Sequence, residues 1–265
     1  MSLELLLSLY ATALGLIVGS YLNVVIHRLP LGISTVLPRS RCPACGAAIR
    51  ARDNVPVISF LLLRGCCHAC GARISPRYPL VEGATGLLFL GSFLRFGVSW
   101  EAVAGAVFCS LMVVLALIDL DHMILPDVLT WPGIALGILL QPLLSWARLG
   151  PGPWRALAGG ALGAAVGAGI LLAVWGGWYL LRHEEGMGLG DVKMLAAIGA
   201  FLGWQGVLVS LFFGALSGAV VGLALMAWRG GDLKSKLPFG TFLAMGGLIA
   251  LFAGERIVAA YARLL

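Results

Sequence analysis

The sequence predicts an all-α protein that crosses a lipid bilayer about eight times. Of its 265 residues, 60% are hydrophobic and only 11% are charged, whereas globular domains carry about 25% charged residues. The mean hydropathy is +0.98. Apolar runs of about 20 residues, the length that a helix needs to cross the hydrocarbon core, recur along the whole chain. These observations indicate a polytopic membrane protein.

The first apolar run is expected to be a retained membrane helix. Its N-terminal flank has no basic residues, and the run is too long for a cleaved signal peptide. Membrane helices are expected at residues 3–26, 79–97, 100–118, 126–146, 156–181, 192–204, 206–228 and 238–262.

The basic residues predict the orientation. Thirteen Lys and Arg residues lie in or at the edges of the connections 27–78, 119–125, 182–191 and 229–237, against five elsewhere. Because cytoplasmic loops are rich in Lys and Arg, this places the first set in the cytoplasm and both termini outside. The net charge of +6 follows from this bias. It does not indicate nucleic-acid binding, because the arginines are not interleaved with aromatic residues.

Three parts of the chain are distinguished. Residues 1–26 form the first membrane helix, residues 27–78 a cytoplasmic loop domain, and residues 79–265 a seven-helix membrane domain. In the fifth and seventh spans, glycine recurs at every fourth position, which is typical of closely packed membrane helices. These glycines are Gly159, Gly163, Gly167, Gly214, Gly218 and Gly222.

The loop domain carries a predicted zinc site. Two Cys-x-x-Cys pairs, each followed by a glycine, are separated by twenty-one residues, a pattern typical of a Cys₄ zinc ribbon. A site with four thiolates leaves no open position for water, so this zinc is expected to be structural. Cys66 and His68 are not expected to be ligands, and Cys109 is interpreted as a packing residue. The predicted ligands are Cys42, Cys45, Cys67 and Cys70.

The sixth expected span, 192–204, is unusually short. Its thirteen residues reach only about 20 Å, whereas the hydrocarbon core is about 30 Å thick. Asp191, in the preceding Gly-rich turn, is therefore expected below the cytoplasmic membrane edge. Irregular backbone at that depth is tolerated only where protein covers it or where it lines a cavity, which marks this turn as a functional site.

Asp119 is the expected partner of Asp191. Both lie on the predicted cytoplasmic side, where a span meets a polar turn, and two neighbouring carboxylates that share one proton are the machinery of an aspartyl protease. Asp121 points about 200° away from Asp119 on a helix, so it and Asp127 are interpreted as capping or solvated residues. Asp191 can cap the helix that follows it and also act as a catalytic residue.

The helix ends suggest different roles for the two acids. Asp191 begins a helix, where the dipole favours an anion, and Asp119 ends one. The hypothesis is that Asp191 is the ionised base and Asp119 carries the proton, although the titration is coupled. Lys193 is interpreted as an interfacial anchor, with a second possibility that it holds Asp191 ionised.

These motifs together resemble the type IV prepilin peptidases, which are bifunctional leader peptidases and N-methyltransferases. The resemblance covers nearly the whole chain and includes segments that have no predicted role of their own. It rests on the segments from Gly19 to Pro30, Asn54 to Pro56, Ile74 to Glu82, Asp119 to Asp127, Gly188 to Lys193 and Pro238 to Gly240, and on both cysteine motifs.

The resemblance implies a GxGD-type aspartyl protease of the bacterial inner membrane. Such an enzyme cuts the short basic leader from prepilins and pseudopilins and methylates the new N-terminal residue with S-adenosylmethionine. It implies Asp119 and Asp191 as catalytic residues, the four cysteines as zinc ligands, and Gly188, Gly190 and Lys193 as the supporting loop. Which prepilins are cut and the oligomeric state stay open.

The cofactor site is not predicted by any motif, because no strand–GxGxxG–helix unit is present. Glu82 is a candidate for that site or for binding a substrate cation, and an ion pair with a loop arginine is an equal alternative. The basic leader is expected to be attracted by acids such as Asp53, Asp121, Glu184 and Glu185.

Two alternative functions remain at this point. One is a peptidase with the same aspartates but without methyl transfer. The other is an ion-coupled transporter, which the glycine-rich helices and the short span would suit. Transporters bind near the bilayer midplane, whereas both acids here lie towards one face, and this favours the peptidase.

Overall fold

The computed structural model describes residues 2–147, 152–183, 187–229 and 237–264, and all regular elements in these ranges are helices. The chain forms two compact units. The first contains Met1–Val98 and Gly105–Val114, and the second contains Ser99–Ala104 and Leu115–Leu265. The helical fold class is confirmed.

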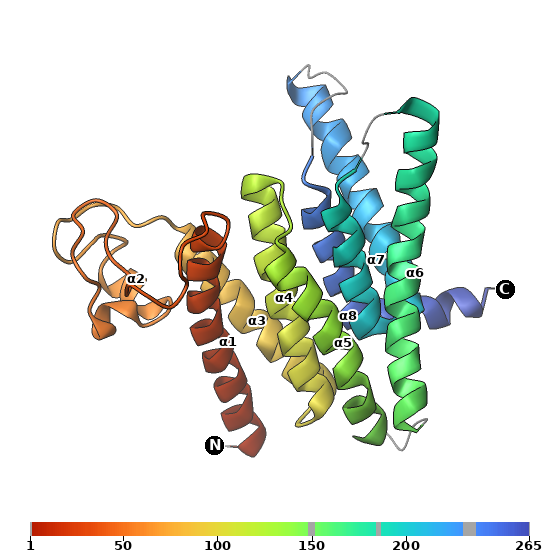
Figure 1. Cartoon of the computed structure of the whole chain (residues 1–265). Coiled ribbons are helices and arrows are strands. Elements are labelled where there is room, and N and C mark those ends of the chain that lie inside the picture. The colour runs from red at the N-terminus through yellow and green to blue at the C-terminus, as the bar shows by residue number, and fades with distance from the viewer. Residues whose placement is uncertain (1, 148–151, 184–186, 230–236, 265) are drawn as a thin grey trace. The chain divides into compact units, whose positions relative to one another are not determined.

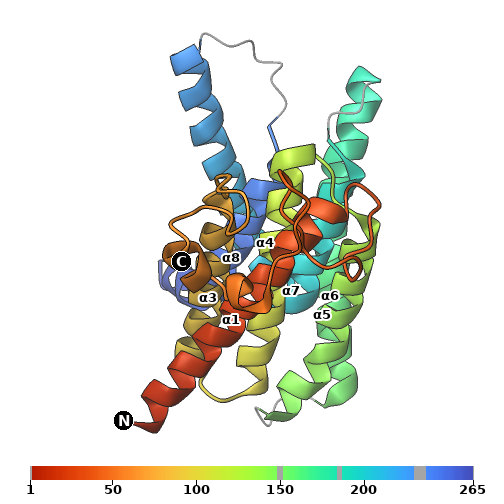
Figure 2. The same ribbon diagram turned by 90° about the vertical axis from the view of Figure 1, so that its left-hand side faces the viewer.

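The first unit is built on two packed helices, α1 (Leu3–Arg28) and α3 (Arg77–Phe96). They approach closely because glycines face each other: a Cβ added at Gly15 would lie 2.8 Å from the Cα of Gly86. The long connection between them contains the short helices η1 (Ala51–Asn54) and α2 (Ile58–Leu62). Both views place this connection at the end of α1 opposite the N-terminus (Figures 1 and 2).

The second unit is a bundle in which α7 packs between α6 and α8 (Figure 1). The helix α4 contributes residues to both units. The helices are α4 (Trp100–His122), α5 (Asp127–Ala147), α6 (Pro153–Arg182), α7 (Leu189–Arg229) and α8 (Phe239–Ala262).

The helix α7 is two antiparallel arms joined at Gly203, whose φ of 71° and ψ of 179° are not helical. Glycine is suited to this turn because it has no Cβ to oppose a positive φ. In the first arm, Gly199 faces Gly163 of α6 and Leu195 faces Gly167, so the arm runs opposite to α6. In the second arm, Ser210 faces Gly246 of α8 and Gly214 faces Leu243, so this arm runs opposite to α8.

Gln141 of α5 satisfies the carbonyl groups that this break leaves without helical partners. Its Nε2 donates to the carbonyl oxygens of Ala200 (2.9 Å) and Phe201 (3.0 Å). The last carbonyls of a helix have no partner within it, and an unpaired backbone group is costly inside a bilayer. The two arms correspond to the expected spans 192–204 and 206–228.

Five helices are long and apolar enough to cross a membrane among the described residues: α1, α4, α6, α7 and α8. The long span of α7 includes both of its arms, and α5 qualifies only as a shorter apolar helix, Asp127–Leu143. The chain is therefore a multi-pass membrane protein.

Near the start of α6, the glycine that faces a neighbouring helix is one residue later in the sequence than expected. Added Cβ atoms at Gly163 and Gly167 would lie 2.1 and 2.4 Å from backbone oxygens of α7, and one at Gly160 would lie 2.8 Å from Gln141. A Cβ at Gly159 would meet nothing within 4 Å. Gly159 therefore lies off the contact face, and Gly160 takes its place.

Gly163→Ala is expected to lower the free energy of unfolding by about 1–3 kcal/mol, the usual effect of overpacking. The added methyl group collides with backbone, which cannot move aside as a flexible side chain does. Thermal unfolding in detergent measures the effect, with Gly159→Ala as the matched control on the same helix. Equal stability of the two variants would show that this glycine contact is not needed.

Candidate active site

Asp119 lies near the end of α4 and is 5% exposed. The helix ends at Met123, whose φ of 53° is left-handed and whose N–H donates to the Asp119 carbonyl oxygen. The side chain of Asp119 turns to the start of α8: its Oδ2 accepts the N–H of Thr241 at 2.9 Å and lies 3.4 Å from the Thr241 hydroxyl oxygen. That hydroxyl also donates to the Ala116 carbonyl oxygen at 2.9 Å. Thr241 thus fixes the Asp119 carboxylate to α8.

Asp191 is the third residue of α7 and is 9% exposed. Its N–H donates to the Gly188 carbonyl oxygen at 3.2 Å, which closes the first helical turn. Asp191 lies within electrostatic range of Asp119. The structure therefore brings together the two acids that the sequence paired, although α5 and α6 lie between them in the chain.

Leu125 fills the space beside the two acids. A Cβ added at Gly190 would lie 2.9 Å from the Leu125 Cβ, and one at Gly240 would lie 3.1 Å from its Cδ1. The same Cβ at Gly240 would lie 2.9 Å from Oδ2 of Asp119. Both glycines are therefore required for close packing around the carboxylates.

Gly188 has a different role from Gly190. Gly190 belongs to the first turn of α7, whereas Gly188 precedes the helix and is exposed. A Cβ at Gly188 would meet Oδ2 of Asp191 only at 4.0 Å. This glycine leaves open space next to the carboxylate, where an extended peptide could approach.

The contacts change the expected asymmetry between the two acids. Asp119 ends α4, as expected, but its carboxylate also receives backbone N–H groups from the start of α8, since both Gly240 and Thr241 face it. Each acid therefore lies at a helix N-terminus, where the dipole favours negative charge. The positions of the two residues at helix ends therefore do not show which one is the ionised base and which one carries the proton.

Three residues of this site were not singled out from the sequence: Thr241, Gly240 and Leu125. The only signal for them was the position of Gly240 in the Pro238–Gly240 segment and of Leu125 between Asp119 and Asp127. Neither segment indicates by itself that α8 begins against the end of α4, because that is a tertiary contact.

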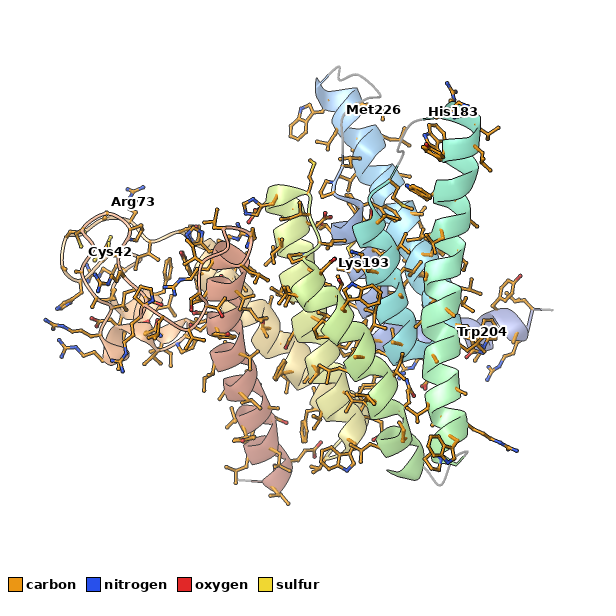
Figure 3. All side chains as sticks on the ribbon, in the orientation of Figure 1. Cys42, Arg73, His183, Lys193, Trp204 and Met226 are labelled. Carbon is orange, nitrogen blue, oxygen red and sulfur yellow. The ribbon has the colours of Figure 1, made fainter. Side chains whose placement is uncertain are left out.

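Lys193 pairs with Asp127, and this ion pair links the first turns of α7 and α5. Figure 3 shows Lys193 well below His183 and Met226, which lie at the ends of α6 and of the second arm of α7. Lys193 thus has a specific partner that the sequence did not indicate, and Asp127 contacts α7 in addition to beginning α5. The pair fixes the turn that carries Asp191.

Lys193→Met is expected to lower kcat for the reaction proposed below by up to about fivefold, because a partly exposed pair contributes about 0–1 kcal/mol. The side chains of Lys193 and Asp127 are 25% and 59% exposed. The double variant Asp127→Lys/Lys193→Asp restores the attraction and should recover part of the activity in a peptide-cleavage assay. A double variant weaker than both single variants would contradict this role.

Asp121 is exposed, consistent with its interpretation as a solvated residue. Glu184 and Glu185, which were expected to attract a basic leader, lie outside the described residues, as does Gly186 at the start of the Gly-rich turn.

The four predicted cysteines form a cluster. The sulfur atoms of Cys42, Cys45, Cys67 and Cys70 all lie within 4.8 Å of one another, and those of Cys42 and Cys70 are 3.9 Å apart. A tetrahedral zinc ion with Zn–S bonds of about 2.3 Å requires sulfur separations of about 3.8 Å. The donor set and its dimensions therefore fit a structural zinc ion.

The duplicated motifs form the same turn twice. Gly46 and Gly71 have φ of +71° and +72°, and their N–H groups donate to the carbonyl oxygens of Cys42 and Cys67, both at 2.9 Å. Backbone N–H groups of Cys45 and Ala44 lower the pKa of the Cys42 thiol to about 7. Against a backbone N–H of Ala72, the side chains of Cys45, Cys67 and Cys42 raise the pKa of the Cys70 thiol to about 12, so the thiolate is favoured at Cys42 and not at Cys70.

The remaining cysteines lie outside the cluster, as expected. Cys66 donates to the Arg64 carbonyl oxygen at 3.6 Å. Cys109 is fully buried in α4, 3.9 Å from the hydroxyl oxygen of Ser92. His68 is exposed.

Glu82 is 8% exposed in α3, and its Oε2 accepts the N–H of Val57 at 2.7 Å. Val57 has a φ of 60°, a costly conformation for a β-branched residue. Glu82 thus holds a strained residue of the long connection. The ion pair with a loop arginine stays an alternative beside this backbone contact.

Known proteins match the chain over nearly its full length. A model of the bacterial peptidase A24 N-terminal domain matches residues 13–96, and one of the type IV leader peptidase family matches residues 106–223. The prepilin leader peptidase/N-methyltransferase of Stutzerimonas stutzeri is 39% identical over 276 residues, with 96% of this chain and 93% of that protein covered. The Pseudomonas aeruginosa protein described by the same words is 38% identical over 271 residues, with 94% and 91% covered. No solved structure matches the chain.

Proposed function

The chain belongs to the type IV leader peptidase family, and we propose that it removes the leader of prepilins or pseudopilins and then methylates the new N-terminal residue. The observation that carries the peptidase half is the pairing of two buried aspartates: Asp119, whose carboxylate contacts the start of α8, and Asp191, at the start of α7. The proposed methyltransferase activity is based on the similarity to proteins whose names include this activity.

In the proposed reaction the two carboxylates share one proton and hold a water molecule between them. One acid takes a proton from this water, which attacks the carbonyl carbon of the peptide bond that follows the leader. The other acid donates its proton to the carbonyl oxygen, which gives a gem-diol. The gem-diol then collapses: the first acid passes its proton to the amide nitrogen as the C–N bond breaks, and the second acid takes a proton back from a hydroxyl group, so that the leader leaves with a carboxyl group and the product with a new α-amine. Oδ2 of Asp119 already accepts the N–H of Thr241, so Oδ1 is the oxygen that we expect to exchange the proton.

The short first arm of α7 supports a site below the membrane surface. Residues 189–202 reach only about 21 Å, against a hydrocarbon core of about 30 Å. We propose eight spans, with the two arms of α7 counted separately and with α3 and α5 included. The bias of basic residues then places the site on the cytoplasmic side of the inner membrane and both termini outside. Lys234 and Lys236, which contribute to that bias, and Arg148, which counts against it, lie outside the described residues.

We propose a different role for each of three consecutive parts of the chain. Residues 1–26 form the first membrane helix, residues 27–78 the cytoplasmic zinc-binding loop domain, and residues 79–265 the membrane domain with the protease site. The zinc ion would be held by Cys42, Cys45, Cys67 and Cys70, and it would supply folding free energy to a segment with little core of its own.

We expect about one equivalent of zinc to copurify with the protein, and we expect Cys45→Ser to remove most of it. The 27–78 segment should then become sensitive to limited proteolysis, because metal binding and folding are coupled there. Elemental analysis and mass mapping of the fragments measure both effects. Cys66→Ser is the control, since Cys66 lies outside the cluster; an equal loss of zinc from both variants would exclude the proposed ligand set.

Glu82 stays the candidate for the methyl-transfer site or for a substrate cation, although the described contact gives it a structural role. S-adenosylmethionine, when bound, would supply the electrophilic methyl group. In that reaction the chain has to present the new α-amine of the substrate in its neutral form.

One experiment separates the candidate functions. The purified protein in detergent is incubated with a prepilin-like peptide and labelled S-adenosylmethionine, and cleavage and methylation are read independently by mass spectrometry. Both products support the bifunctional enzyme, and cleavage alone supports a peptidase only. Absence of cleavage by folded protein, together with ion flux in vesicles, would favour the transporter.

A further inference from the structure

Residues 29–38 form an uncharged segment that directly follows the membrane helix α1; it is called the 29–38 loop here. Arg28 precedes it and Arg39 follows it. Four of its side chains are large, apolar and exposed: Leu31 (55%), Ile33 (47%), Val36 (75%) and Leu37 (68%). Contiguous exposed apolar residues of this kind mark an interaction surface.

The 29–38 loop folds back along α1. The hydroxyl groups of Thr35 and Tyr21 are 3.2 Å apart. Tyr21 precedes Arg28 by seven residues, so it lies about 10 Å back along the helix axis. Thr35 is therefore level with a residue inside the membrane helix and does not extend beyond its end.

The surface of α1 next to this contact is also apolar. Leu14, Ile17 and Tyr21 are 41%, 60% and 51% exposed, and their spacing places them on one helix face. This face reaches the 29–38 loop at Tyr21. The exposed side chains of the loop therefore continue an exposed apolar surface of α1.

Most backbone donors of the loop are satisfied internally. Among its eight N–H groups, six donate to carbonyl or hydroxyl oxygens within residues 25–34: those of Leu29, Leu31, Gly32, Ile33, Val36 and Leu37. Its two other residues, Pro30 and Pro38, have no N–H.

Arg28 closes the loop by donating from Nη1 to the carbonyl oxygens of Ser34 (3.1 Å) and Pro38 (2.8 Å). A loop in water does not need this degree of internal pairing. A loop in lipid does, because an unsatisfied group there costs several kcal/mol.

We propose that the 29–38 loop inserts into the lipid bilayer beside the end of α1, with its four apolar side chains among the acyl chains. Arg28 and Arg39 then lie at the level of the lipid phosphates, where their long side chains reach the interface. Cys42 follows only three residues after Arg39. The inserted loop therefore anchors the start of the metal-binding segment at the membrane surface.

The test uses the full-length protein in phosphatidylethanolamine/phosphatidylglycerol vesicles. A genetically encoded fluorescent amino acid replaces Val36 in one variant and Arg50, an exposed residue of the same connection, in the other. Fluorescence is quenched separately by lipids brominated in the acyl chain and by aqueous iodide.

At position 36 we expect blue-shifted emission, quenching by bromolipids several-fold stronger than at position 50, and little quenching by iodide. At position 50 we expect the reverse. Strong iodide quenching at position 36, without bromolipid quenching, would overturn the proposal. If that iodide quenching disappeared on addition of a prepilin-like peptide, the surface would instead be a substrate-binding site. None of these outcomes depends on the proposed enzymatic activity.

Discussion

Asp119→Asn and Asp191→Asn are each expected to lower kcat for leader cleavage by about 10⁴-fold, the scale seen when a residue of a catalytic unit is removed. An asparagine cannot exchange the proton that the proposed mechanism passes between the two carboxylates. Burial adds to the effect, because solvent cannot easily replace a side chain that is 5% or 9% exposed. Single-turnover cleavage of a prepilin-like peptide in detergent measures the loss.

The double variant should be no worse than either single variant, because residues that act as a unit are not additive. Asp121→Asn is the matched control: it lies on the same helix, is exposed, and points about 200° away from Asp119. Its kcat should be unchanged, even if the proposed attraction of Asp121 for a basic leader makes its KM higher. Cleavage retained by either single variant would rule out the pairing.

The sequence contained the information for the local features of this molecule. Apolar runs of membrane length predicted the helices, and the short span predicted the break in α7, because a helix cannot cross lipid unless its length suffices. The duplicated cysteine motif predicted the cluster, since each Cys-x-x-Cys-Gly turn is determined by a few neighbouring residues. Asp119 and Asp191 were recognisable because ionisable residues beside membrane helices are rare.

Tertiary contacts between distant segments were not predictable in the same way. The donor to Asp119 is a backbone N–H of Thr241, and any residue but proline has this group. The partner of Lys193 is Asp127, which by sequence was simply the first acid of a helix. The shift from Gly159 to Gly160 on the contact face of α6 depends on how α5 and α7 pack there, and periodicity alone does not report it.

Gly240 belongs to the packing contact of α8 and also lies next to the carboxylate of Asp119. A Cβ at this position would lie 2.9 Å from Oδ2 and 3.1 Å from Cγ of Asp119, and 3.1 Å from Cδ1 of Leu125. Such a Cβ has no free direction, so the carboxylate has to move or α8 has to shift. Either change displaces Asp119 relative to Asp191 and to the N–H of Thr241.

Gly240→Ala is therefore expected to lower kcat for cleavage by about 100-fold, the cost of a misplacement of about 1 Å in a catalytic group. Substrate affinity should change much less, because the added methyl group faces Asp119 and Leu125. Gly254→Ala is the control on the same helix, since its Cβ would meet only the Ala250 Cβ at 3.8 Å. Steady-state cleavage gives kcat and KM for both variants, and methylation of a precut peptide reports whether the protein is folded. If Gly240→Ala cleaves as fast as the unmodified protein, the close approach of α8 does not position Asp119, and the two aspartates are held by α4 and α7 alone.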